Sequence, residues 1–315
     1  MIGAQLQREY GLPHIIKIVV QDFKKNKWLY GMALPMIVYY IMFRFAPMYG
    51  VIISFKDFSP GKGIIQSPWV GLEHFETFFS DIYFGRIIKN TLAISLQGLV
   101  FGFPAPIILA LLMNELRSER FKRCVQTTSY LPHFISLVVV CGMIVDFTAS
   151  DGVINDLIVA LGGERSTLLL KSNLFRPIYI ISDIWQGIGW GSIIYLAALT
   201  GIDQQLYEAA TIDGAKRFAK MWHIALPGIS PTIIILFILR IGSIMDVGYE
   251  KILLLYNANI YETADVISTY VYRKGLLNFQ YSFSTAVGLF NSVISFMLVF
   301  LANWLSKTLN ETSLW

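Results

Sequence analysis

The 315-residue chain is 55% apolar and only 15% charged, whereas a soluble domain carries about 25% charged residues. Its net charge of +4 is spread along the sequence without a long basic run, which argues against a nucleic-acid partner. This composition excludes an ordinary soluble domain and indicates an all-α protein that crosses a lipid membrane several times.

The amino-terminal segment, residues 1–27, precedes the first long apolar stretch. Within residues 15–23, apolar side chains recur at helical spacing among charged ones, a pattern typical of an amphipathic helix in the membrane interface. A cytosolic helix packed on a partner fits this pattern equally well. The first apolar stretch begins at Trp28 and lacks a small-x-small cleavage site, so we expect no cleaved signal peptide.

Six segments are long and apolar enough to span a bilayer, whose core takes about 20 apolar residues of helix. They are residues 28–53, 88–113, 125–147, 177–199, 229–255 and 283–305. Lys and Arg cluster most tightly at span ends that face the cytoplasm when the amino terminus is inside, which places both termini there. The predicted organisation is thus an interfacial segment 1–27, a six-span domain 28–306 and a cytoplasmic tail 307–315.

The loop between the fourth and fifth predicted spans, residues 201–227, has a distinctive pattern. Glu208, Ala209 and Ala210 favour a helix. Gly214 can stop one helix and turn the chain into another, and proline in Leu226-Pro227 is accepted in the first turn of the fifth span. The sequence predicts two short helices hinged at Gly214, which could pass a push from a soluble partner into the spans.

This loop resembles the EAA loop of bacterial ABC importer permeases, because Glu208-Ala209-Ala210 is followed by Gly214, Ile224 and Leu226-Pro227. The resemblance implies the fold of a type I importer permease, in which this loop inserts into a groove on an ATPase subunit. The coupling residues that it implies are Glu208, Ala209, Ala210, Asp213, Gly214, Leu226 and Pro227.

Other segments resemble the permeases for complex oligosaccharides and polysaccharides, including alginate importers, within the maltose-type branch. They are Phe121-Lys122-Arg123, Tyr130-Leu131-Pro132-His133, Gly189-Trp190-Gly191, Thr269-Tyr270-Val271-Tyr272-Arg273 and Ala286-Val287-Gly288-Leu289-Phe290. The resemblance runs from about Trp28 to Trp315. It implies a second permease, related or identical, two ATPase subunits that hold ATP and Mg, an extracytoplasmic binding protein and a bacterial cytoplasmic-membrane location.

Polar and aromatic residues inside the spans are candidates for the solute pathway. Charges at membrane depth usually face a cavity or a partner, which selects Arg240 and Asp246 in the fifth span, although helical spacing argues against an intimate pair. Arg240 either lines the pathway, where it would suit a uronate, or braces a neighbouring subunit. Trp185, Gln186 and Tyr195 in the fourth span could contact a sugar, although packing also explains aromatic residues in membranes.

Other intramembrane residues have structural interpretations. Arg44 and Asp183 are expected to anchor span ends. Gly187, Gly189 and Gly191 indicate close helix packing rather than a nucleotide fingerprint. Cys124 and Cys141 are expected to be small packing residues, with neither a disulfide nor a zinc site.

Enzymatic and other transport functions have less support. The sequence contains no Gly-x-x-x-x-Gly-Lys-Ser/Thr motif for ATP, and its four histidines are scattered without an HExxH motif or a nucleophile elbow. A secondary transporter or a channel is the alternative, but no inverted repeat is evident and neither explains the loop 201–227. The expected function is a non-catalytic permease subunit without a cofactor or metal of its own.

Overall fold

The computed structural model describes residues 21–310, and every regular element in that part is a helix apart from one bridge between Lys56 and Trp69. The predicted all-α fold is confirmed. The expected interfacial helix before Trp28 lies largely outside the described residues. The chain divides into two units, the first ending at Trp69 and the second beginning at Val70.

The first unit is dominated by one helical run of 29 residues, Lys27–Phe55, which is apolar on average and exposed along its most apolar stretch. Such a surface is suited to lipid or to another subunit. Lys56 then closes the following loop, because its Nζ donates to the carbonyls of Ile64 at 2.8 Å and Ser67 at 3.2 Å. The elements are α3 (Lys27–Tyr40), η1 (Ile41–Phe45), α4 (Ala46–Met48), η2 (Tyr49–Phe55) and α5 (Gly63–Gln66).

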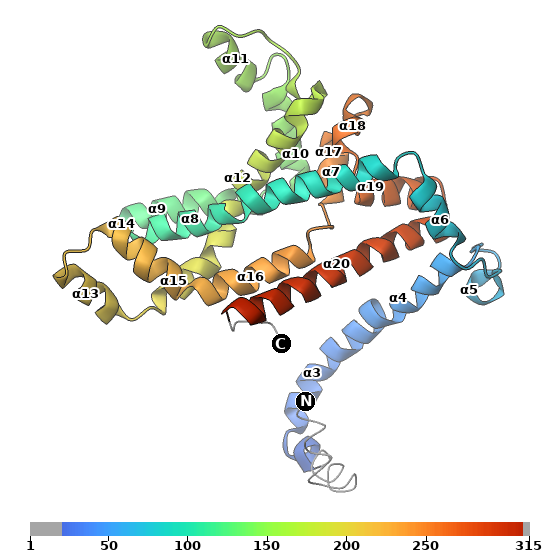
Figure 1. Cartoon of the computed structure of the whole chain (residues 1–315), viewed down its shortest axis with the longest axis horizontal. Helices are drawn as coiled ribbons and strands as arrows, with labels where there is room; N and C mark the ends of the chain where they lie inside the picture. The colour runs from blue at the N-terminus through green and yellow to red at the C-terminus, as the bar shows by residue number, and fades with distance from the viewer. Residues whose placement is uncertain (1–20, 311–315) are drawn as a thin grey trace. The chain divides into compact units, whose positions relative to one another are not determined.

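The second unit contains the remaining helices, with α8, α9 and α12 in contact and α16 lying beside α20 (Figure 1). Its first half consists of α6 (Glu73–Ser80), α7 (Phe84–Gln97), η3 (Gly98–Gly102), α8 (Pro104–Asn114), α9 (Glu119–Tyr130), η4 (Leu131–Phe134), α10 (Leu137–Thr148), α11 (Val153–Ala160), η5 (Leu168–Leu170) and α12 (Ser172–Thr200). Its second half consists of α13 (Gln204–Ile212), α14 (Arg217–Lys220), η6 (Met221–Ala225), α15 (Leu226–Gly228), α16 (Ser230–Gly242), α17 (Tyr249–Leu255), η7 (Ala258–Ile260), α18 (Tyr261–Ala264), α19 (Ile267–Tyr272), η8 (Arg273–Leu277) and α20 (Tyr281–Asn310).

Four helices of the described chain are long and apolar enough to cross a membrane: Lys27–Phe55, Phe84–Asn114, Leu137–Ala160 and Tyr281–Thr308. A bent pair of helices over residues 217–242 brings the number to five when it is taken as one span. The 29-residue α12 has sufficient length, but polar residues such as Asp183 lower its apolar character. The count of six is therefore not reproduced in full.

The third predicted span, 125–147, was placed too early in the chain. The helix before it ends at Tyr130, and Pro132 lies in a short 3₁₀ turn. Ser136 then begins α10, because its hydroxyl accepts a hydrogen bond from the amide of Val139 at 3.4 Å. The apolar helical region consequently covers Leu137–Ala160.

The fifth predicted span, 229–255, is not one continuous helix. The helix α16 ends at Gly242, and residues 243–248 form a turn that leads into α17. A β-carbon at Gly242 would lie 2.6 Å from Cγ2 of Val299, so glycine permits the close approach of α16 and α20 at the break. We call residues 242–248 the break. At the other end of the chain, α20 continues to Asn310, beyond the predicted start of the tail at 307.

Close packing around α12 agrees with the glycine pattern in part. A β-carbon at Gly189 would collide with the backbone of Ser129, and one at Gly191 would lie 3.0 Å from Pro106 Cγ, so the packing prediction is confirmed at both positions. Gly187 has open space instead.

The two cysteines differ in their surroundings. Cys141 is buried in a hydrophobic core, as expected, whereas Cys124 is exposed in this chain. The packing prediction is therefore confirmed for Cys141 and wrong for Cys124, which lies on α9 away from the buried clusters.

Candidate functional site: a helical elbow and a polar groove

The loop between α12 and α16 folds into a helical elbow, which we define as residues 203–228. The first arm, α13, starts at an N-cap in which the Asp203 carboxylate accepts a hydrogen bond from the Gln205 amide at 2.9 Å. Figure 1 shows α13 and α14 projecting at one end of the helices of the second unit.

The arm α13 ends in a Schellman motif. The amide of Ala215 donates to the carbonyl of Ala210 at 2.8 Å, and the amide of Gly214 donates to the carbonyl of Thr211 at 3.1 Å. This geometry places Gly214 at φ +77°, in the left-handed region that glycine adopts without steric cost. The predicted hinge between two helices is present at this position.

The second arm is one helical run over residues 217–228 that meets α16 at an angle of 61°. Lys220 Nζ donates to Thr211 Oγ1 at 2.7 Å and ties the two arms together. Proline at 227 continues this arm, and α16 begins at Ser230 with Pro231 in its first turn. The expected entry of the fifth span at Leu226-Pro227 was therefore three to four residues early.

The surface of the elbow combines polar groups with large apolar side chains. Glu208 and Ala209 are exposed on α13, and so are Ile212 at 87%, Phe218 at 70% and Trp222 at 58%. Apolar side chains gathered on a protrusion are typical of a surface that binds another protein.

The base of the elbow is fixed to the second unit. Ile202, Tyr207 and Leu226 pack against the core that joins α8 to α12. Pro227 beside them is exposed. A displacement of the elbow would therefore reach α8, α12 and α16 directly.

Charged residues meet near the break. Arg240 lines two neighbouring cavities, one of about 290 Å³ that it shares with Asp183 and Asp246, and one of about 420 Å³ that it shares with Asp183 and Tyr195. Arg240 and Asp246 thus face one cavity without forming an ion pair with each other or with another residue of the described chain. The break, rather than a helix, brings Asp246 to this place.

Asp183 belongs to this cluster and does not simply anchor a span end. Its Oδ1 lies 3.4 Å from Nζ of Lys251, whose side chain is almost fully buried. Lys251 Nζ also donates to the Tyr179 carbonyl at 3.3 Å and lies 4.8 Å from the centre of the Tyr179 ring. Sequence reasoning missed Lys251, although a lysine within a predicted span carries the same signal that selected Arg240.

The aromatic candidates of α12 do not gather around Arg240. Trp185 lines an apolar cavity of about 630 Å³ on another face of the helix, and Gln186 Nε2 donates to the Ile135 carbonyl at 3.5 Å. Tyr195 is buried in the core between α8 and α12 and touches the 420 Å³ cavity. Trp190 stacks on His133, with 4.6 Å between the ring centroids.

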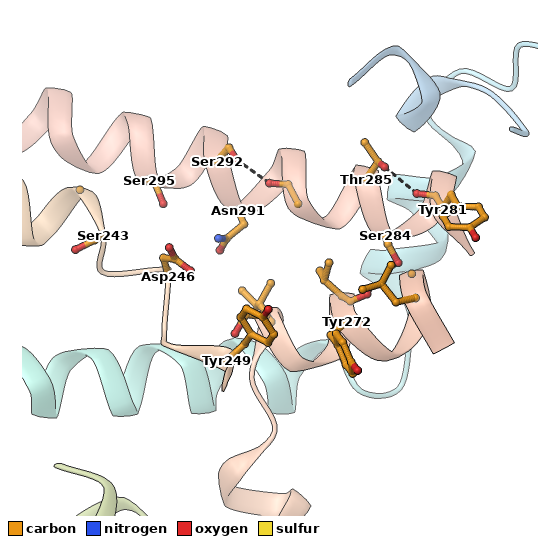
Figure 2. A pocket seen from close by; sticks show the side chains of 17 residues that line it. Ser243, Asp246, Tyr249, Tyr272, Tyr281, Ser284, Thr285, Asn291, Ser292 and Ser295 are labelled. Carbon is orange, nitrogen blue, oxygen red and sulfur yellow. Dashed lines mark hydrogen bonds between the residues drawn. The ribbon is translucent and has the colours of Figure 1, made fainter. Parts of the chain in front are cut away.

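A second feature beside the break is a polar groove of about 840 Å³ between α20, α19 and the segment 242–249 (Figure 2). Ser284, Gly288, Asn291 and Ser295 on α20 recur every three or four residues and therefore lie on one face of the helix. We call this space the α20 groove. The spacing alone could have revealed this polar face, which sequence analysis did not consider.

A buried network of charged residues stabilises the segment that precedes α20, residues 265–273. The Asp265 carboxylate is fully buried and accepts hydrogen bonds from Arg273 at 2.7 and 2.6 Å and from Thr269 at 2.8 Å, with Arg86 at 3.6 Å. Burial lowers the pKa of Arg273, but the hydrogen bonds and charge of Asp265 outweigh that effect and hold this pKa above its ordinary value.

Several helices apolar enough to cross a membrane, together with polar cavities between them, are features of a membrane transport protein. The chain belongs to the family described as binding-protein-dependent transport system inner membrane components, whose model matches residues 102–311.

Two relatives from Bacillus subtilis (strain 168) are similar over most of the chain. Protein LplB is 47% identical over 292 residues, which cover 92% of each chain. The polygalacturonan/rhamnogalacturonan transport system permease protein YteP is 46% identical over 302 residues, which cover 96% of this chain and 92% of the relative.

Solved structures agree with these relatives. A chain of a bacterial ABC transporter involved in the import of the acidic polysaccharide alginate is 45% identical, with a TM-score of 0.86 over 93% of this chain and 99% of that chain. A similar chain, 44% identical with the same TM-score and coverage, comes from an alginate ABC transporter in complex with a periplasmic protein that holds an alginate pentasaccharide.

Proposed function

We propose that this chain is a permease subunit of an ABC importer and forms half of the pathway for an oligosaccharide or polysaccharide. The observation that carries the proposal is the 46% identity, over 96% of the chain, to a polygalacturonan/rhamnogalacturonan permease. The likeness to a chain of an alginate importer supports the same class of cargo. The subunit is itself non-catalytic.

The proposed complex contains a second permease, two ABC ATPases with ATP and Mg, and an extracytoplasmic solute-binding protein. It lies in a bacterial cytoplasmic membrane with both termini of this chain in the cytoplasm. The alginate transporter in complex with its periplasmic protein supports the binding-protein component. The exposed apolar run Lys27–Phe55 leaves a surface for the second permease or for lipid.

The elbow is the proposed docking site of one ATPase subunit. Its exposed apolar residues suit a protein groove, and its base packs on the core that joins α8 to α12. Movement of the ATPase would push the elbow as a rigid body and change access to the cavities at the break. The proposed coupling residues are Glu208, Ala209, Ala210, Asp213, Gly214, Leu226 and Pro227.

Arg240 is the proposed contact for a uronate carboxylate, because a guanidinium pairs well with carboxylates and Arg240 has no ion-pair partner in the described chain. Asp183 and Asp246 face the same cavity and would limit how many carboxylates enter it. Trp185, Gln186 and Tyr195 stay candidates for the pathway, with a weaker case because they lie on different faces of α12.

The proposal is tested by uptake into proteoliposomes that hold the chain with its co-expressed permease, ATPases and binding protein. The probes are labelled oligogalacturonate, a rhamnogalacturonan fragment and a neutral galacto-oligosaccharide. ATP-dependent uptake of at least one probe is expected. Uptake driven by an ion gradient without ATP, or no uptake of any glycan, would contradict the proposal.

A further inference from the structure

The α20 groove has a chemical character different from the cavities around Arg240. Of the 17 residues that line it, none is Lys or Arg, and Asp246 is the one with a formal charge. A carboxylate in the groove would face a like charge with no cation on the lining to offset it. The groove is therefore unsuited to a uronate group.

Several serine and threonine hydroxyls on the groove wall donate their hydrogens to backbone carbonyls. Thr285 Oγ1 donates to the Tyr281 carbonyl at 2.8 Å, and Ser292 Oγ donates to the Gly288 carbonyl at 3.0 Å. Figure 2 shows both bonds. The oxygen lone pairs of these side chains are left as acceptors.

Asn291 adds an acceptor that lacks a partner. Its Oδ1 is buried and accepts no hydrogen bond in the described chain, and Figure 2 shows its side chain extending from α20 into the groove, toward the side where Asp246 lies. An unpaired buried amide oxygen costs about 1–3 kcal/mol, so a ligand hydroxyl would recover that loss once a rotation of the Asn291 side chain turns the oxygen to the groove.

An aromatic pair closes one side of the groove. Tyr249 and Tyr272 both line it and stack with 6.0 Å between their ring centroids. Aromatic faces suit the apolar faces of sugar rings, and sugar hydroxyls can donate to the Asn291 Oδ1 and to the Asp246 carboxylate. The volume of about 840 Å³ also falls within the about 300–1,000 Å³ typical of ligand sites.

We infer that the α20 groove binds a neutral, hydroxyl-rich sugar unit of the transported glycan. This inference rests on the proposed function. It assigns neutral sugar units to the α20 groove and uronate carboxylates to the cavities that Arg240 lines. Ser243 lines the groove and both Arg240 cavities, so a glycan of several units could contact both sites at once.

Two variants test the groove. Gly288→Leu adds a side chain at a position that lines the groove and where a β-carbon meets nothing within 4 Å, so it should reduce the space for a ligand. Asn291→Leu removes the unpaired acceptor and keeps a similar volume. Phe296→Leu is the matched control, because Phe296 lies on α20 outside the groove and is 70% exposed.

The measurement is ATP-dependent uptake by the reconstituted complex, with a rhamnogalacturonan fragment, which alternates neutral and uronate units, and an oligogalacturonate of equal length. We expect both variants to raise the KM for the rhamnogalacturonan fragment about tenfold. The KM for the oligogalacturonate should stay within about twofold of the value for the unmodified chain. Phe296→Leu should behave as the unmodified chain.

The other outcomes overturn the inference. Unchanged uptake of the mixed glycan, an equal loss for both probes, or loss of the second permease on purification would assign the groove to packing or to a subunit interface. A wild-type complex that imports oligogalacturonate but no glycan with neutral units would overturn the inference and leave the proposed function intact. A wild-type complex that imports no probe would overturn both.

Discussion

The guanidinium of Arg273 donates two hydrogen bonds, at 2.7 and 2.6 Å, to the fully buried carboxylate of Asp265. The pair lies in the segment that leads into α20, whose polar face forms one wall of the proposed sugar site. Bidentate pairs of this kind fix geometry as well as supplying energy. The pair therefore sets the position of α19 before α20 begins.

Asp265→Ala should destabilise the chain strongly, because it leaves Arg273 without its carboxylate. Removal of one partner of a buried pair costs about 3–5 kcal/mol, and we expect the lower end since Arg273 is 24% exposed. The measurement is thermal unfolding of the purified complex in detergent. Asp156→Ala is the control, since it breaks the exposed Arg165–Asp156 pair and should cost at most about 1 kcal/mol; equal losses would contradict this account.

Gly214→Pro should uncouple ATP hydrolysis from uptake, because proline is locked near φ −65° and cannot adopt the φ of +77° at the elbow. The protein should still insert, since Gly214 lies in an exposed turn outside the apolar helices. The readout is the ratio of sugar imported to ATP hydrolysed. Gly162→Pro is the control, because it imposes a similar backbone conflict, at φ +87°, away from the elbow. It should keep the normal ratio of sugar imported to ATP hydrolysed. Full transport by Gly214→Pro would refute the elbow's role.

Ile212→Glu should weaken the attachment of the ATPase, because it puts a charge on the most exposed apolar side chain of the elbow. We expect at least about a tenfold loss of affinity, as for an interface anchor. Co-purification of the ATPase with the tagged chain measures it. Leu161→Glu is matched in exposure, 88% against 87%, but lies at the end of α11 and should leave ATPase binding unchanged. Equal binding by both variants would exclude Ile212 from the interface.

Asp183→Asn should destabilise the buried core to which α12 and α17 both contribute, because it leaves the buried ammonium of Lys251 without its carboxylate partner. The expected cost is on the order of 1–3 kcal/mol, reduced by the half-exposed position of Asp183. Adding Lys251→Met to this variant should restore most of the loss, since no buried charge then remains unpaired. Thermal unfolding of the single and double variants gives the coupling free energy between Asp183 and Lys251. Strictly additive losses of stability would show that the two residues do not interact.

Long apolar runs were readily predicted from the sequence. The helices at Lys27–Phe55, Phe84–Asn114 and Tyr281–Thr308 follow from hydropathy alone, because each is continuous and apolar. The hinge at Gly214 was also predictable, since the left-handed region after a helix demands glycine.

Features that depend on tertiary contacts were not predicted. The break after Gly242 lies where α16 approaches Val299 of α20, a contact that no local pattern in α16 records. The pairing of Asp183 with Lys251 joins residues 68 positions apart, so helical spacing within one span could not reveal it. The displacement of the third span has a local cause, because the turn at Pro132 and the N-cap at Ser136 separate α9 from α10.

The break in α16 also changes the medium around the charges beside it. A helix that stops within a membrane leaves backbone groups that lipid cannot satisfy, and residues 243–248 adjoin three cavities that water can fill. Water there would raise the local dielectric constant, which lowers the cost of placing a charged side chain within a membrane. A continuous α16 would leave less room for water beside Arg240, Asp183 and Asp246, and would therefore raise the cost of charge at this place.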